Sequence, residues 1–180
     1  MNLKRMKQSL AVCVCGLVAC AQIGRGAVTN TYYVDAANGA PSAPYATWAD
    51  AADNIQDAVT QAEADLGPGT NVVVLVTNGV YTLATEIAVT ASVTIRSVNG
   101  WGQTSINGDW PNVMTRCFNV TGDAVIDGFT MTNSNIDPLP NTIEDDGGAL
   151  IMYAGRLQNC WIEDNKGYYG GSLYTLGPVT

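Results

Sequence analysis

The densest group of side chains that could do chemistry is a run of three carboxylates, Glu144, Asp145 and Asp146. Carboxylate oxygens are hard ligands of the kind that Ca²⁺ prefers, so these residues are the candidate metal site of the chain. Asp137 and Pro140 place the run in a predicted loop, where acidic runs are usually solvated surface features. Solvated charges are therefore the favoured interpretation, and a bound Ca²⁺ is the alternative.

Aromatic side chains form a second candidate site. Exposed aromatic rings suit the flat faces of sugar rings, which makes the adjacent Tyr168 and Tyr169 candidates for glycan stacking. A glycine pair follows them and predicts a turn, so at least one of the two rings should be exposed. Four further aromatic residues could join such a surface, or instead brace turns and fill the core: Trp101, Trp110, Trp161 and Tyr174.

No group of residues in the sequence predicts catalysis. Histidine is absent, which excludes Ser-His-Asp catalysis, Cys-His catalysis and His-liganded zinc. Glycoside hydrolysis needs two carboxylates at a controlled separation, and only Asp123 and Asp127 stand near one another on a predicted strand. We therefore predict no catalytic residue, and no cofactor apart from Ca²⁺ at the acidic run. Three arginines stand beside turns or strands and are expected at the surface: Arg96, Arg116 and Arg156.

The first 21 residues have the pattern of a secretory signal peptide. Basic residues precede an apolar run from Leu10 to Cys20, and Ala19-Cys20-Ala21 is a small-residue cleavage signal. The residues before Ala21 also resemble a bacterial lipobox, which makes Cys20 a lipidation candidate. The run is too short to span a bilayer comfortably, so no transmembrane span is expected in the mature chain. The sequence predicts an exported protein that is extracellular, at the cell surface or associated with the outer membrane.

The charge balance bears on the partners of the chain. There are 16 acidic and 8 basic residues, a net charge of −8, and three of the basic residues belong to the predicted signal peptide. A chain this acidic should repel nucleic acid and anionic membrane surfaces. We expect no nucleic-acid partner, and a polysaccharide or cell-envelope glycan is the candidate ligand.

Residues 22–70 are expected to form an N-terminal strand, a loop and a capping helix. Thr31–Asp35 is a short β-prone run, and a loop rich in Asn, Gly and Pro follows it. Thr47 is the predicted N-cap of one continuous helix, with Asp50 as the acidic partner of a capping box. The helix should end at Gly67. Its predicted apolar stripe consists of Trp48, Ala52, Ile55, Val59 and Ala62.

Residues 71–180 are expected to form the first coils of a parallel β-helix. The segments are short, apolar and bounded by Asn, Asp or Gly, and Gly147–Leu150 recurs as Gly170–Leu173. Self-similarity at about 20 to 30 residues is typical of a solenoid, in which each unit stacks on the last. Aligning the coils places Phe129 and Cys160 in one inward column.

Two cysteines follow the predicted signal peptide, Cys117 and Cys160. An oxidising compartment would permit a disulfide between them. The alignment of coils matches Cys117 with Gly148, in a different column from Cys160, so we favour free thiols with Cys160 as a small buried hydrophobe.

Several short motifs carry a resemblance to a known family. They include Tyr33-Val34-Asp35, Ile55-Gln56-Asp57-Ala58-Val59, Val76-Thr77-Asn78-Gly79-Val80-Tyr81, Arg96-Ser97-Val98-Asn99-Gly100 and Asp127-Gly128-Phe129-Thr130. These resemble the N-terminal part of exported bacterial right-handed parallel β-helix proteins of the pectin-lyase-like superfamily. The Gly-Gly-Ala-Leu repeat is also similar to that of the polymorphic outer membrane proteins.

The resemblance implies an all-β fold, a right-handed single-stranded parallel β-helix with an N-terminal capping helix. Because such proteins are usually longer and Thr180 falls in mid-coil, we expect the remaining coils of a longer chain as partners. The favoured function is a non-catalytic secreted or cell-surface solenoid, adhesin-like or glycan-binding. The alternative is a polysaccharide lyase or glycoside hydrolase whose active coils lie beyond residue 180.

Overall fold

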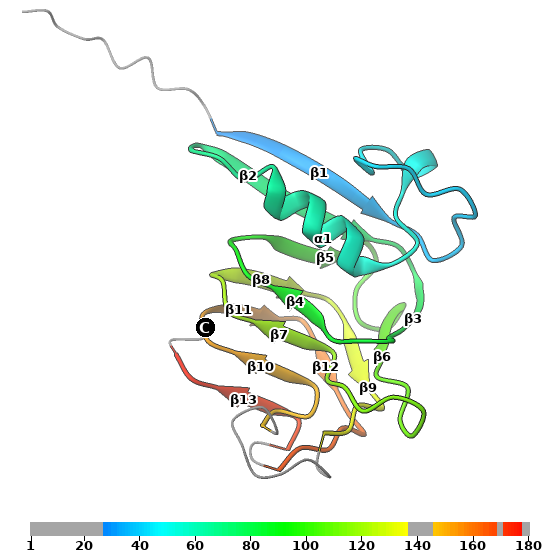
Figure 1. The fold of residues 1–180 in the computed structure, drawn as a ribbon, viewed down its shortest axis with the longest axis vertical. Helices are drawn as coiled ribbons and strands as arrows, with labels where there is room; N and C mark the ends of the chain where they lie inside the picture. Colours follow the sequence, from blue (N-terminus) through cyan, green and yellow to red (C-terminus); the bar gives the residue numbers. More distant parts are fainter. Residues whose placement is uncertain (1–26, 137–145, 169–170, 178–180) are drawn as a thin grey trace, which may run out of the picture.

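The computed structural model describes residues 27–136, 146–168 and 171–177. The strands form three sheets in which every pairing is parallel (Figure 1). Sheet A contains β1 (Val28–Val34), β2 (Thr70–Val76), β5 (Thr94–Ser97), β8 (Ala124–Asp127) and β11 (Gly155–Gln158). Sheet B contains β3 (Gly79–Thr82), β6 (Thr104–Asn107), β9 (Thr130–Thr132) and β12 (Trp161–Ile162). Sheet C contains β4 (Ile87–Val89), β7 (Phe118–Val120), β10 (Leu150–Met152) and β13 (Leu173–Thr175).

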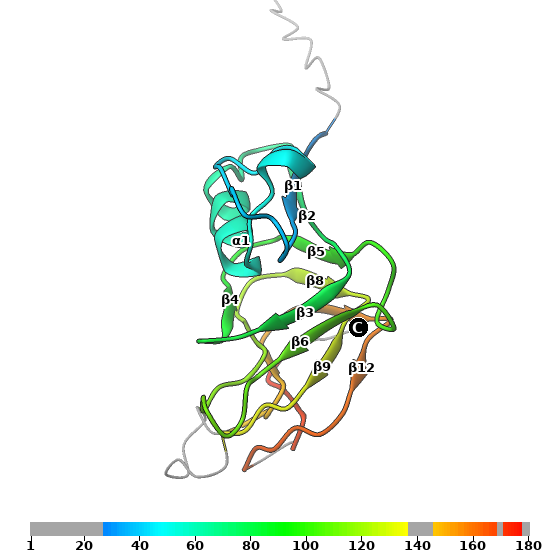
Figure 2. The same cartoon turned by 90° about the vertical axis from the view of Figure 1, so that its right-hand side faces the viewer.

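From β2 onward the chain visits sheets A, B and C in turn, and each strand pairs with its counterpart in the next coil. This is a parallel β-helix, and the predicted fold class is confirmed. The three sheets enclose one core between them (Figure 2). No helix among the described residues is long and apolar enough to cross a membrane.

The core is built from apolar columns that run through the stack. In sheet A, Val74 pairs with Ile95 and Ile95 with Ile126, and all three are fully buried. Because side chains alternate between the two faces of a strand, one apolar residue in every two suffices to line the interior. Burial at about 25 cal/mol per Å² of apolar surface is then gained repeatedly along each column.

The predicted column of Phe129 and Cys160 is confirmed. β9 and β12 pair through Thr130 and Trp161, which places Cys160 beside Phe129, and the Phe129 N–H donates to Cys160 Sγ over 3.5 Å. Phe129 is fully buried and Cys160 packs against the core.

The predicted match of Cys117 with Gly148 is wrong by one position. Phe118 pairs with Leu150, so Cys117 lies beside Ala149 and donates its N–H to the Ala149 carbonyl over 2.8 Å. Both cysteines are free thiols, as expected. Burial raises the pKa of Cys117 to about 12, against a weaker opposing effect of the Ser134 hydroxyl, so this thiol stays protonated at neutral pH.

The turns between sheets A and B repeat at a fixed place, as the Asn and Gly positions predicted. Gly128 follows β8 with φ 84°, and Asn159, beside it in the next coil, has φ 52°. Asparagine is one of the few residues besides glycine that adopt this left-handed conformation. Gly128 also lies against the coil above, because an added Cβ would stand 3.3 Å from Gly100 Cα.

The single helix predicted from Trp48 is instead two helices. A 3-10 helix, η1, spans Trp48–Asp50, and the α-helix α1 spans Ile55–Ala64. Between them Ala52 bonds to the first strand: its N–H donates to the Tyr33 carbonyl over 2.9 Å, and its carbonyl accepts from Asp35 N–H over 2.8 Å. These bonds require extended backbone, so the helix cannot run through.

Each helix has its own N-cap. Thr47 accepts from the Asp50 N–H over 3.3 Å, so the predicted capping pair forms but caps only η1. Asn54 caps α1 by accepting from the Asp57 N–H over 2.9 Å. Trp48 is consequently outside the apolar stripe of α1; it is 43% exposed and packs against Tyr33.

The helix α1 closes the first edge of sheet C, where none of the described strands pairs with β4 on the side away from β7. Gln56 takes the place of a strand: its Oε1 accepts from the Ala88 N–H over 2.7 Å, and its Nε2 donates to the Ala88 carbonyl over 3.3 Å. Further along, Glu63 accepts from the N–H groups of Thr90 and Ala91. Two side chains of one helix thus satisfy backbone groups that would otherwise lack partners.

We expect Gln56→Ala to lower the free energy of unfolding by about 1–3 kcal/mol, because it leaves a backbone donor and acceptor of Ala88 unpaired. Chemical denaturation followed by circular dichroism measures this change. Gln61→Ala is the matched control, since the Gln61 amide reaches only Asp65 on the same helix. Equal effects of the two substitutions would show that Gln56 does not close the edge.

Candidate functional site

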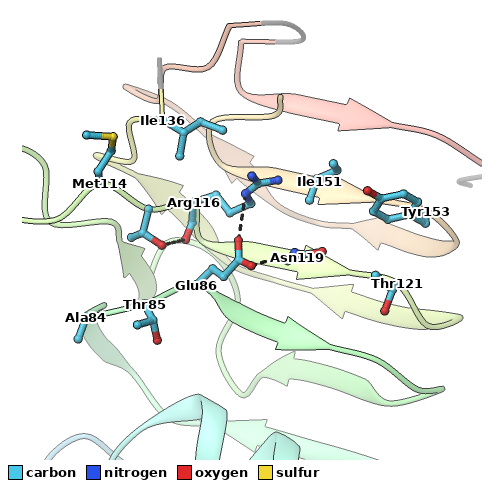
Figure 3. Close-up of a pocket in the computed structure, with 11 residues that line it drawn as sticks. Ala84, Thr85, Glu86, Met114, Arg116, Asn119, Thr121, Ile136, Ile151 and Tyr153 are labelled. Carbon is cyan, nitrogen blue, oxygen red and sulfur yellow. Dashed lines mark hydrogen bonds and ion pairs between the residues drawn. The ribbon is translucent and has the colours of Figure 1, made fainter. Parts of the chain in front are cut away.

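An open groove of ≈ 570 Å³ lies on the outer side of sheet C, and we call it the sheet C groove (Figure 3). It crosses three successive coils, because the segment just before β4, the strand β7 and the strand β10 each contribute lining residues. Its lining contains both polar and apolar side chains. The lining residues are Ala84, Thr85, Glu86, Met114, Thr115, Arg116, Asn119, Thr121, Ile136, Ile151 and Tyr153.

The register of the stack positions the floor of the groove. Asn119 at the centre of β7 pairs with Ala88 of β4 on one side and with Ile151 of β10 on the other. These central residues point outward because their strand neighbours Phe118 and Val120 point into the core. Glu86 immediately precedes β4, and Arg116 stands shortly before β7, so both enter the groove from the same rim.

A buried arginine, Arg116, pairs with Glu86 in the groove. Arg116 Nε lies 3.0 Å from Glu86 Oε2, and the side chains are 6% and 34% exposed, respectively. Asn119 Nδ2 donates to Glu86 Oε1 over 2.8 Å, so both carboxylate oxygens of Glu86 are engaged. The expectation that Arg116 is a surface residue is wrong. The connection before β7 turns its side chain into the groove wall, where Glu86 balances the charge that burial would otherwise make costly.

One hydrogen-bond acceptor at the groove, Asn119 Oδ1, has no donor among the described residues. This atom is buried, and the amide is oriented by the bond from its Nδ2 to Glu86. A buried acceptor without a donor costs free energy that an incoming hydroxyl or water could recover. Glu86 and Asn119 were not predicted as site residues. Neither belongs to a sequence motif, and only the register of the coils brings them together.

The acidic run of the candidate Ca²⁺ site is represented by one described residue. Glu144 and Asp145 lie outside the described residues, whereas Asp146 is 2% exposed and its Oδ1 has no hydrogen-bond partner in the described part of the chain. The expectation of solvated charge is therefore wrong at Asp146. Two residues further on, Gly148 donates its N–H to the Gly171 carbonyl of the next coil over 2.6 Å. This segment therefore packs against the next coil, and Asp146 is buried with it. Within residues 27–136, 146–168 and 171–177 no three metal-ligating side chains cluster.

The aromatic candidates separate in space. Tyr168 is exposed, and Tyr169 lies outside the described residues. Trp101 and Trp161 meet on the outer side of sheet B with ring centroids 5.4 Å apart. Tyr174 belongs to β13 and Trp110 to the connection after β6. The lipidation candidate Cys20 also lies outside the described residues.

Asp123 and Asp127 do not form a pair of catalytic carboxylates. Asp123 is exposed, whereas Asp127 is buried in a polar ladder across sheet A. Its Oδ2 accepts from Arg96 Nε and its Oδ1 from Asn159 Nδ2, both over 2.8 Å. Burial alone would raise the pKa of Asp127, but the hydrogen bonds from Asn159, Gln158 and Arg96 together outweigh it and hold that pKa below its usual value.

Comparison with family models, with curated proteins and with solved structures finds no match to this chain.

We expect Arg116→Met to lower the free energy of unfolding by about 2–4 kcal/mol, because it leaves the Glu86 carboxylate without its cation in a partly buried site. Arg96→Met is the comparison. The Arg96 side chain is half exposed and Asp127 keeps its hydrogen bonds from Asn159 and Gln158, so the loss should be smaller, about 1 kcal/mol. Urea denaturation of both variants measures the difference, and a smaller cost at Arg116 than at Arg96 would contradict the buried pair.

The lowered pKa of Asp127 predicts a pH-dependent contribution to stability. The contribution is complete above the unfolded pKa of about 3.9 and is lost as the pH falls through the lower folded value. At pH 7 we expect Asp127→Asn to cost about 1–3 kcal/mol, and the gap to the unsubstituted protein should narrow below about pH 4. Asp123→Asn, an exposed carboxylate beside the same strand, should cost little at either pH. A gap that widens in acid would refute the assignment.

Proposed function

We propose that this protein is an exported, non-catalytic β-solenoid that binds a glycan at the cell surface, with the sheet C groove as its binding site. The observation that carries the proposal is that both carboxylate oxygens of Glu86 are already engaged. Glu86 is the one carboxylate among the described residues lining the groove, and its partners are Arg116 and Asn119. Hydrolysis of a glycosidic bond needs two carboxylates with separate roles, so this arrangement supports binding rather than cleavage.

The composition of the groove favours a saccharide. Sugar rings present both hydroxyl groups and C–H faces, and the lining offers partners for both. Thr85, Thr121 and the Asn119 amide offer hydrogen bonds, while Met114 and Ile151 offer apolar contact. The buried acceptor Asn119 Oδ1 lacks a donor among the described residues, which a ligand hydroxyl or a bridging water could supply. A groove that crosses three coils along the stack also suits a polymer better than a compact small molecule.

The remaining parts of the proposal rest on the sequence. The signal-peptide pattern of residues 1–21 supports export, and Cys20 supports a lipid anchor as one route to the surface. The cycling of strands through three parallel sheets supports a place in the pectin-lyase-like superfamily. A polysaccharide lyase or glycoside hydrolase is the alternative. The hydrolase would need a second carboxylate, which the described lining of the groove lacks.

The proposal predicts that the full-length protein binds a polysaccharide without shortening it. Affinity electrophoresis against neutral and acidic polysaccharides measures binding, and release of reducing ends or unsaturated products measures cleavage. We expect Glu86→Gln and Asn119→Ala to weaken binding about tenfold or more, because each alters a hydrogen-bonding group of the groove. Asp123→Asn should bind like the unsubstituted protein. Turnover of any polysaccharide, or binding indifferent to both groove substitutions, would sink the proposal.

A further inference from the structure

Two tryptophans that are distant in the sequence stack on the outer side of sheet B. Trp101 lies in the connection between β5 and β6, and Trp161 is the first residue of β12. Their ring centroids are 5.4 Å apart with the planes inclined by 23°, and the residues are 48% and 50% exposed. Sheet B, which contains Trp161, faces the viewer in Figure 2. We call Trp101 and Trp161 the indole platform.

The indole platform is held in place before any ligand arrives. The Thr130 hydroxyl of β9 donates to the Trp101 carbonyl over 2.9 Å, and Thr130 is also the strand partner of Trp161. The Trp161 backbone N–H donates to the Phe129 carbonyl over 2.9 Å, and its indole Nε1–H donates to Glu163 Oε2 over 2.8 Å. Preorganised rings lose little conformational entropy on binding, which is how rigid aromatic side chains contribute affinity.

A groove of ≈ 570 Å³ adjoins the platform and has the polarity of a sugar site. Gln103 supplies an amide, and Ser105 and Thr130 supply hydroxyls. Glu163 is the charged group of this lining, and no described residue of the lining is cationic. Side chains that only brace turns would be expected to bury their rings, whereas here two stacked indoles each stay about half exposed beside hydrogen-bonding groups.

We infer that the indole platform is a second carbohydrate-binding site, which takes a neutral glycan by stacking a sugar ring on the exposed indole surface. Glu163 would repel a uronate carboxylate at close range, and the net charge of −8 adds to that repulsion. The site lies on a different sheet from the sheet C groove and shares no lining residue with it. Binding at the indole platform can therefore be tested independently of binding at the sheet C groove.

The test uses the full chain and two probes of equal length, a β-1,4-linked glucose hexasaccharide as the neutral probe and a hexagalacturonate as the acidic one. Tryptophan fluorescence and calorimetry follow both titrations. We expect the neutral probe to bind and to quench fluorescence, and the acidic probe to bind at least about tenfold more weakly. Trp161→Ala should weaken binding of the neutral probe about tenfold or more, and Trp161→Phe, which keeps an aromatic ring, should retain part of it.

Three further variants make the result specific. Trp110→Ala removes another exposed indole, away from the platform, and should leave the affinity unchanged. Glu163→Gln should narrow the preference for the neutral probe by improving the binding of the acidic one. Glu86→Gln should leave these titrations unchanged, which separates this site from the sheet C groove. Tighter binding of the acidic probe, no binding of the neutral probe, or equal affinities of the protein and Trp161→Ala would each overturn the inference.

Discussion

Each coil of this protein depends on backbone hydrogen bonds to the coils beside it. A parallel β-helix gains its stability from contacts between neighbouring coils. At the first edge of each sheet the backbone N–H and C=O groups have no neighbouring strand to pair with. On sheet C the edge of β4 is closed by the Gln56 amide, which provides the same donor and acceptor that a strand would provide to Ala88. The register of β7 and β10 follows from β4, and with it the row of outward residues that makes the sheet C groove.

Stacking also explains why the surfaces of this fold can carry binding sites at little cost to the core. Phe118 and Val120 fill the interior while Asn119, between them, faces the groove. A substitution at Asn119 changes the groove wall and leaves the buried columns unchanged. Arg116 is the exception, because its side chain is buried and its charge is balanced by Glu86. Binding chemistry and stability are coupled at that one pair, so its substitution should affect both.

Spacing in the sequence predicted the features that repeat. The column of Phe129 and Cys160 follows from a separation of 31 residues, and the turn at Asn159 follows from its place in the coil. The match of Cys117 with Gly148 failed because the same spacing does not hold before β10, where Phe118 pairs with Leu150. A repeat period alone cannot locate one extra residue in a connecting loop.

The spacing of residues in the sequence did not predict features that occur in only one coil. The apolar stripe from Trp48 fits a helix, but the backbone bonds of Ala52 to β1 divide it, and these come from tertiary contact. Burial of Arg116 and of Asp146 likewise follows from how connections fold onto the next coil. Glu86 and Asn119 were missed for the same reason, since each is an isolated polar residue until the register aligns them.

The two proposed sites occupy different sheets of one rigid stack, and this geometry has a consequence for affinity. The indole platform joins the connection before β6 to β12, with its ring centroids 5.4 Å apart, and so offers contact to a short stretch of a sugar chain. The sheet C groove runs along the stack as well, from the segment before β4 across β7 to β10. A glycan network that reaches both faces would bind with the combined strength of two modest sites, because the second contact is made at high effective concentration. Weak individual affinities are therefore compatible with firm attachment to a polymeric surface.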